Sequence, residues 1–180
     1  MPERTVLYGP DEVDMALAKA AADVLRRRDP LPALVGIRRG GVKVMGRLNE
    51  IFAKTLGRPL ESGIVDINLY RDDWTQAGAF PKVGPTDIAF SLEGRRILLV
   101  DDVLYTGRTV RAALDALSEF GRSACVELLA LVDRGHREMP IQADYAGFTI
   151  QTDAGEIVEV DFNGEPPGIE VVLIKPGQHF

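Results

Sequence analysis

The sequence predicts an α/β fold with a mostly parallel sheet flanked by helices. Short runs of Ile, Leu and Val alternate with helical patterns along the chain, and this alternation is typical of strand–helix–strand units. Uninterrupted apolar runs suit strands that are buried on both faces, as in the centre of a parallel sheet. Such strands are expected at residues 33–37, 97–100 and 124–132. Helices are expected at residues 10–28, at about 40–56 and from about 110 to a C-cap at Gly121.

Length and composition favour one globular domain spanning residues 1–180. The hydrophobic content is 46%, and the net charge of −6 argues against a generally basic nucleic-acid binder. The single cysteine, Cys125, allows no disulfide within the chain and is expected to be a small buried residue. No apolar run is long enough to span a membrane, so we expect a cytoplasmic protein without membrane contacts.

The first helix has recognisable ends. Pro10 suits the first helical position, and Asp11 and Glu12 suit the positive end of the helix dipole. Three arginines at residues 26–28 fall in the last turn, where cations are favourable. These arginines are either a solvated helix end or a nucleic-acid patch.

The most informative stretch runs from Ile97 to Thr109. A buried strand leads into two adjacent carboxylates, Asp101 and Asp102, which should point to opposite sides near the carboxyl end of the strand. That end is where open α/β sheets bind ligands. A loop over residues 106–109 then supplies hydroxyl and N–H groups at a helix N-terminus, which favours a phosphate. The carboxylates are expected to hold ribose hydroxyls or a hydrated Mg²⁺.

Three further segments complete the candidate site. The turn at residues 38–41, Arg-Arg-Gly-Gly, is either an anion site or a plain glycine turn. Residues 65–69 alternate as a half-exposed strand, and the polar stretch at about 71–90 is either a lid or a surface hairpin. The strand at 124–132 ends in Asp-Arg-Gly-His-Arg at residues 133–137, where we favour a ligand role for His136 over a surface role.

Three of these stretches resemble one family. Residues 101–112 read Asp-Asp-Val-Leu-Tyr-Thr-Gly-Arg-Thr-Val-Arg-Ala, which resembles the 5-phosphoribosyl 1-diphosphate (PRPP) motif of type I phosphoribosyltransferases. The sequence resembles one branch in particular, the pyrimidine operon regulator/uracil phosphoribosyltransferase branch. The stretches that carry this resemblance are residues 101–112, 66–73 and 132–140. Many members of that branch have Thr-Arg-Gly where this chain has Arg39-Gly40-Gly41. The resemblance still implies that this turn binds the diphosphate, but it does not carry over the individual side-chain contacts of the family.

The resemblance implies an enzyme that converts uracil and PRPP to UMP and diphosphate with Mg²⁺, on a type I phosphoribosyltransferase fold with a small hood and a flexible loop. The residues it points to for catalysis are Asp101, Asp102, Arg38, Arg39 and Arg71. The implied metal ligands are Asp101, Asp102 and Asp133. The implied substrate-binding residues are Gly40, Tyr105, Thr106, Gly107, Arg108, Thr109, Asp133, Arg134, His136 and Arg137.

Base specificity and regulation follow from the same resemblance. Purine phosphoribosyltransferases usually have Asp where this chain has Tyr105, so a pyrimidine is expected. An alternative is a weakly catalytic or non-catalytic regulator that senses UMP or UTP and binds pyrimidine-operon leader RNA; another is a transferase for a different base. Relatives form dimers and tetramers, so a homodimer or homotetramer is expected. The hood and a hairpin at 157–173 are expected within residues 145–175.

Overall fold

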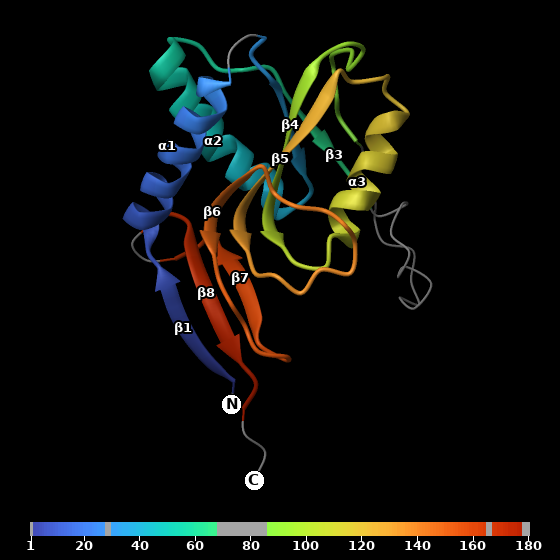
Figure 1. Ribbon diagram of the computed structural model, residues 1–180. Coiled ribbons are helices and arrows are strands. Elements are labelled where there is room, and N and C mark those ends of the chain that lie inside the picture. The colour runs from blue at the N-terminus through green and yellow to red at the C-terminus, as the bar shows by residue number, and fades with distance from the viewer. Residues whose placement is uncertain (1, 28–29, 68–85, 165–166, 178–180) are drawn as a thin grey trace.

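The computed structural model describes residues 2–27, 30–67, 86–164 and 167–177. Its larger sheet has five parallel strands in the order β3-β2-β4-β5-β6 (Figure 1). The strands are β2 (Ala33–Ile37), β3 (Ser62–Val65), β4 (Arg96–Leu104), β5 (Cys125–Asp133) and β6 (Tyr145–Thr149). The mostly parallel α/β sheet expected from the sequence is therefore confirmed.

Helices cover both faces of this sheet. They are α1 (Pro10–Arg26), α2 (Gly40–Leu56) and α3 (Arg108–Ser118). In β4, Leu98 and Val100 pack with α1 and α2, whereas Ile97 and Leu99 pack with α3. Figure 1 shows the same arrangement, with α1 and α2 together on one side of the sheet and α3 on the other. The uninterrupted apolar run of β4 is explained by burial on both faces.

A smaller antiparallel sheet lies beyond the carboxyl ends of the central strands (Figure 1). Its order is β1-β8-β7, with β1 at Glu3–Tyr8, β7 at Ile157–Asp161 and β8 at Glu170–Lys175. The hairpin of β7 and β8 was expected from the sequence, whereas β1 was not. The strand β6, which lies in the stretch assigned to the hood, belongs to the larger sheet.

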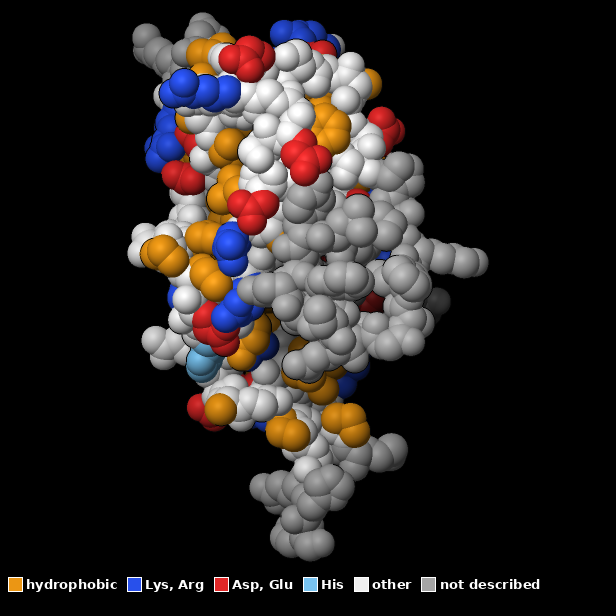
Figure 2. Space-filling view, turned by 90° about the vertical axis from the view of Figure 1, so that its right-hand side faces the viewer, with side chains coloured by type: hydrophobic (Ala, Val, Ile, Leu, Met, Phe, Trp, Pro, Cys, Tyr) orange, Lys and Arg blue, Asp and Glu red, His pale blue; other side chains and the backbone are white. Residues whose placement is uncertain are grey.

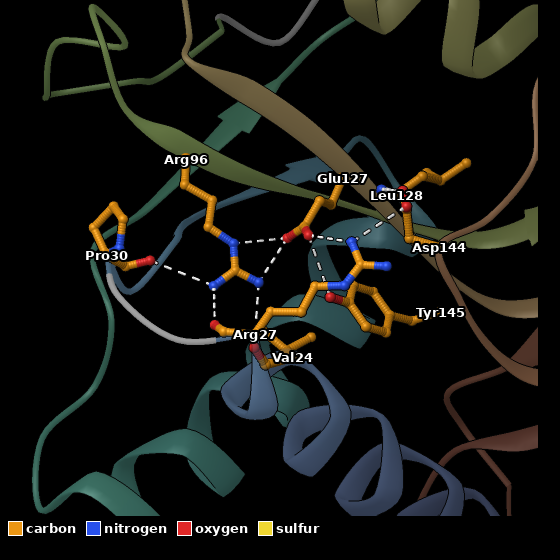
Figure 3. A network of polar contacts seen from close by, with 8 residues as sticks. All are labelled: Val24, Arg27, Pro30, Arg96, Glu127, Leu128, Asp144 and Tyr145. Carbon is orange, nitrogen blue, oxygen red and sulfur yellow. Dashed lines mark hydrogen bonds and ion pairs between the residues drawn. The ribbon is translucent and has the colours of Figure 1, made fainter.

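Buried charges join α1 to the sheet at the edge opposite the carboxyl ends (Figure 3). Arg96 donates from Nε to Glu127 at 2.8 Å, and its terminal nitrogens donate to the carbonyl oxygens of Val24 and Arg27 at the end of α1. Arg27 and the Tyr145 hydroxyl also donate to Glu127, at 2.6 and 3.3 Å. Burial raises the pKa of Glu127, but the hydrogen bonds from Arg27 and Arg96 outweigh it, so the pKa lies below its ordinary value.

Three local expectations are wrong. The strand expected at 65–69 lies at 62–65, and Asp66, expected on an exposed face, is only 4% exposed. Gly121 is not the C-cap of α3, because the helix already ends at Ser118 and Glu119 is its C-cap. Cys125 is exposed, because it is the first residue of β5 and precedes the buried part of the strand. Among the described residues no helix is long and apolar enough to cross a bilayer.

Candidate active site

The candidate site lies where β2, β4 and β5 end side by side. Because the three strands are parallel neighbours, the segments that follow them meet at one edge of the sheet. These segments are the turn at residues 38–41, the loop at 105–109 and the loop at 134–144. The structure therefore brings together three of the predicted stretches, which are separated by up to about 100 residues in the sequence.

Two glycines bring the start of α2 against β4. A Cβ atom at Gly40 would lie less than 3.0 Å from the carboxylate atoms of Asp102. A Cβ atom at Gly41 would overlap the carbonyl oxygen of Val100 and lie 3.1 Å from the Cα of Asp101. Only glycine leaves room for this approach, so the turn is more than a flexible connection. The N-terminal end of α2, with its free N–H groups, thereby lies next to the Asp102 carboxylate.

The two adjacent carboxylates have different surroundings. Asp101 is 4% exposed, and its Oδ1 accepts a hydrogen bond from the Asp102 N–H at 3.0 Å. Burial raises the pKa of the Asp101 carboxyl well above its ordinary value, and the charge of Asp102 adds to this. Asp102 is only half-buried and faces the glycine turn. Asp102 is therefore the carboxylate that a ligand in the cleft can reach more easily.

Arg38 is anchored by a residue that the sequence analysis did not single out. Its Nε lies 3.4 Å from Oδ2 of Asp66, which follows β3 and is buried. The Asp66 N–H in turn donates to the Thr86 hydroxyl at 3.0 Å. Arg39 is exposed, and the peptide bond between Arg38 and Arg39 is cis. Arg71 and most of the predicted flexible loop lie outside the described residues.

The loop at 105–109 surrounds a cavity of about 310 Å³, which Asp101, Val103 and Glu138 also line. Gly107 has a φ of 90° and is the N-cap of α3, which allows the chain to turn from the loop into the helix. The Thr106 carbonyl oxygen accepts hydrogen bonds from the N–H groups of Glu138 and Met139, at 2.9 and 3.0 Å. The loop is therefore held by the segment that follows β5. The size of the cavity and the helix N-terminus both suit a phosphate group.

The guanidinium of Arg137 holds the start of the loop after β5 in place. Arg137 donates to Oδ2 of Asp133 at 2.6 Å, to the Tyr105 carbonyl oxygen at 2.7 Å and to the Ile141 carbonyl oxygen at 2.8 Å. The Asp133 Oδ1 accepts from the Gly135 N–H at 3.0 Å. Arg137 and Asp133, which were predicted to bind substrate, thus also connect the two neighbouring loops.

A second cavity of about 910 Å³ lies between this loop and the residues that follow β6. Arg134 lines it and is 6% exposed, and its guanidinium lies over the Tyr105 ring at 4.1 Å from the centroid. His136 lies edge-on to the same ring at 5.9 Å, and its Nε2 is 2.8 Å from the carbonyl oxygen of Thr152. Because a carbonyl oxygen only accepts, this hydrogen bond places a proton on Nε2.

The three carboxylates predicted as metal ligands are not gathered into one cluster. Among the described residues, no group of three or more His, Cys, Asp or Glu side chains is placed to hold a metal ion. Asp133 is already bonded to Arg137, whereas Asp101 and Asp102 are adjacent at the cleft. Mg²⁺ is commonly held by one or two carboxylates together with substrate phosphates. The donor set that is present therefore fits a magnesium ion that arrives with a phosphorylated substrate.

The fold and the arrangement of these loops define the class of protein, a type I phosphoribosyltransferase. Residues 10–163 match the family model of the phosphoribosyl transferase domain, and the chain belongs to this family. The fold is also that of solved hypoxanthine phosphoribosyltransferases. The enzyme from Trypanosoma cruzi is 17% identical, with a TM-score of 0.69 and coverage of 96% of this chain and 97% of the other. An enzyme from Staphylococcus aureus is 22% identical, with a TM-score of 0.65 and coverage of 85% and 80%.

Two relatives with similar sequences show to which branch of the family the chain belongs. A protein named bifunctional protein PyrR from Desulfosudis oleivorans is 45% identical over 178 residues, which cover 97% of this chain and 98% of the relative. A protein of the same name from Geobacter sulfurreducens is 46% identical over 181 residues, which cover 97% and 100%. The chain therefore belongs to the PyrR branch of the phosphoribosyltransferases, and the family resemblance seen in its motifs is confirmed.

Proposed function

We propose that this chain transfers a phosphoribosyl group from PRPP to uracil, which yields UMP and diphosphate. The observation that carries the proposal is the adjacent pair Asp101 and Asp102, which lies between the glycine turn at 40–41 and the N-terminus of α3. This arrangement offers carboxylates to a sugar and two helix N-termini to phosphate groups. In the reaction the bond from the anomeric carbon to diphosphate breaks, a bond to N1 of uracil forms, and the N1 proton leaves.

The ribose 5-phosphate part of PRPP is assigned to the smaller cavity. Residues 106–109 would bind the 5-phosphate through their N–H and hydroxyl groups. Asp101 and Asp102 would hold the ribose hydroxyls, and the negative charge of Asp102 would favour the positive character that develops on the ring. Arg38 and Arg39 would bind the departing diphosphate from the turn after β2. The role of Arg38 is supported by Asp66, which restricts the position of its guanidinium.

Magnesium is the cofactor that we assign to this site. Asp101 and Asp102 supply hard oxygen ligands of the kind that Mg²⁺ prefers, and Asp102 is the more accessible of the two. When bound, the ion would neutralise charge on the diphosphate group.

The base is assigned to the larger cavity, which is lined by the two side chains that contact the Tyr105 ring, Arg134 and His136. Its polar lining includes Arg134, His136, Gln142 and Gln151, which offer several hydrogen-bond donors. Uracil presents two carbonyl oxygens, so a wall rich in donors suits it. The cavity volume of about 910 Å³ exceeds that of any single base, so size does not exclude purines. Specificity would therefore depend on the polar groups and on Tyr105.

A second candidate function is regulation of a pyrimidine operon by binding its leader RNA under the control of UMP or UTP. The observation that favours it is that the relatives are named bifunctional proteins. The face that carries α3 shows acidic and basic side chains interspersed over its described part (Figure 2), which does not single this face out for RNA. RNA affinity should fall steeply with salt, because binding neutralises phosphates and releases counterions.

One assay separates these functions. Purified protein is incubated with PRPP, Mg²⁺ and, in parallel, uracil, orotate, hypoxanthine, guanine or xanthine, and nucleotide formation is measured. We expect UMP from uracil alone, and strongly reduced UMP formation when Asp101 and Asp102 are both changed to Asn. RNA binding should survive that double change. Turnover of a different base would contradict the uracil assignment, and no turnover with any base would favour the regulator.

A further inference from the structure

Arg134 is a buried cation that no described carboxylate neutralises. Its side chain is 6% exposed, and no ion pair joins it to a described Asp or Glu. Its guanidinium donates two hydrogen bonds to described residues, both from Nη2, to the Thr152 hydroxyl at 3.1 Å and to the Glu156 carbonyl oxygen at 2.8 Å. Among the residues that the structure describes, Nε has no hydrogen-bond partner. Burying a guanidinium this way is costly, so the orientation of Arg134 depends strongly on its few partners.

Thr152 contacts both Arg134 and His136. Its hydroxyl accepts the hydrogen bond from Arg134 and also lies 3.2 Å from Nε2 of His136. Its carbonyl oxygen accepts from the same Nε2 at 2.8 Å. One residue of the segment after β6 therefore holds two side chains of the loop after β5.

The two side chains that Thr152 holds enclose the ring of Tyr105. Arg134 lies over the face of the ring and His136 lies against its edge. His136 has a φ of 57°, a backbone conformation that is uncommon for residues other than glycine. The hydrogen bond that Nε2 donates to the Thr152 carbonyl oxygen is therefore suited to hold His136 in an otherwise unfavourable conformation.

We propose that Thr152 is a positioning residue for base recognition, which holds Arg134 and His136 in the orientation that the larger cavity requires. The inference rests on the proposed function, because it assigns this cavity to the base. Thr152 does not line the smaller cavity, to which the ribose 5-phosphate is assigned. Loss of its hydroxyl should therefore weaken the base interaction and leave the phosphate interaction intact.

The test compares Thr152→Val, which removes the hydroxyl while nearly preserving shape, with Thr152→Ser, which restores the hydroxyl. Binding of UMP and of ribose 5-phosphate is measured by calorimetry, because the difference between the two ligands isolates the base. Thr152→Val should weaken UMP binding about tenfold, or about 1.4 kcal/mol, the scale of one hydrogen bond to a charged group. In the transferase assay it should raise the KM for uracil by a similar factor, with kcat and the KM for PRPP unchanged.

Two comparisons make the test specific. Thr152→Ser should behave like the wild type, and Thr5→Val, which changes an exposed threonine of β1 in the smaller sheet, should change neither ligand. Equal weakening of UMP and ribose 5-phosphate, a Ser variant as weak as Val, or unchanged UMP binding in Thr152→Val would each overturn the inference. If wild-type protein binds UMP no better than ribose 5-phosphate, the assignment of the base cavity fails first, which distinguishes the two failures.

Discussion

Replacing Gly40 by alanine tests whether the turn after β2 sets the position of Asp102. The added Cβ would lie less than 3.0 Å from the Asp102 carboxylate, so this side chain must move by about 1 Å or more. The Asp102 side chain is flexible and half-buried, so the fold should tolerate the change. A displacement of about 1 Å in a group that positions substrate can cost about 100-fold in rate. We therefore expect kcat/KM for UMP formation to fall about 100-fold, with little change in stability.

The assay is steady-state UMP formation at saturating Mg²⁺, together with thermal unfolding of the same preparations. The matched control is Gly46→Ala in the same helix, where a Cβ meets no atom within 4 Å. That change should leave activity intact and stabilise the protein by about 0.5–1 kcal/mol, because alanine is the better helix former. If Gly40→Ala keeps activity within about threefold of the wild type, the reasoning that ties this turn to Asp102 is refuted.

Three further changes test the surroundings of the site. Gly41→Ala places a methyl group against the backbone of Val100, which no side-chain rotation relieves, so we expect a loss of about 2 kcal/mol in unfolding free energy, seen as a lower Tm. Glu127→Gln leaves a buried arginine without its charge partner and should cost about 3 kcal/mol at pH 7, whereas the exposed Glu159→Gln should cost almost nothing. Because the pKa of Glu127 is lowered in the folded state, its contribution is present above its ordinary value of 4.5 and is lost as pH falls below that value, so the two unfolding curves should converge in acid. Asp101→Asn should abolish activity yet unfold at a higher temperature than the wild type at pH 7, because the raised pKa of Asp101 makes its ionisation unfavourable in the folded state. The difference in Tm between the two proteins should shrink as pH falls toward the ordinary pKa of 3.8. A variant that is less stable than the wild type at pH 7 would contradict this prediction.

Local sequence patterns were sufficient to predict the main parts of the candidate site. The strand of β4, its two carboxylates and the glycine at the start of α3 are contiguous in the sequence, and each has a short-range physical signature. The right-handed, parallel arrangement of strand–helix units then requires that their carboxyl ends share one edge. The clustering of residues near 40, 105 and 135 could therefore be expected before any contact was known.

Residues whose role depends on a distant partner could not be found in this way. Asp66 occupies a position that alternation assigns to an exposed face, but in the fold it is buried beside Arg38. Thr152 carries no local signal, because its importance comes from Arg134 and His136, 16 to 18 residues earlier. The strand β1 was missed because it is a short edge strand whose pairing with β8 spans nearly the whole chain.

The sequence by itself determined the class of fold, the family and the position of the loop that we propose to bind phosphate, because these depend on hydrophobic period and on residues that are close along the chain. Only the tertiary structure decided which carboxylate is buried, how Arg38 is held and which residues enclose Tyr105. Those properties depend on desolvation and on hydrogen bonds between segments far apart in sequence. Such interactions act over only a few ångströms, so they are set by the packing of the completed fold.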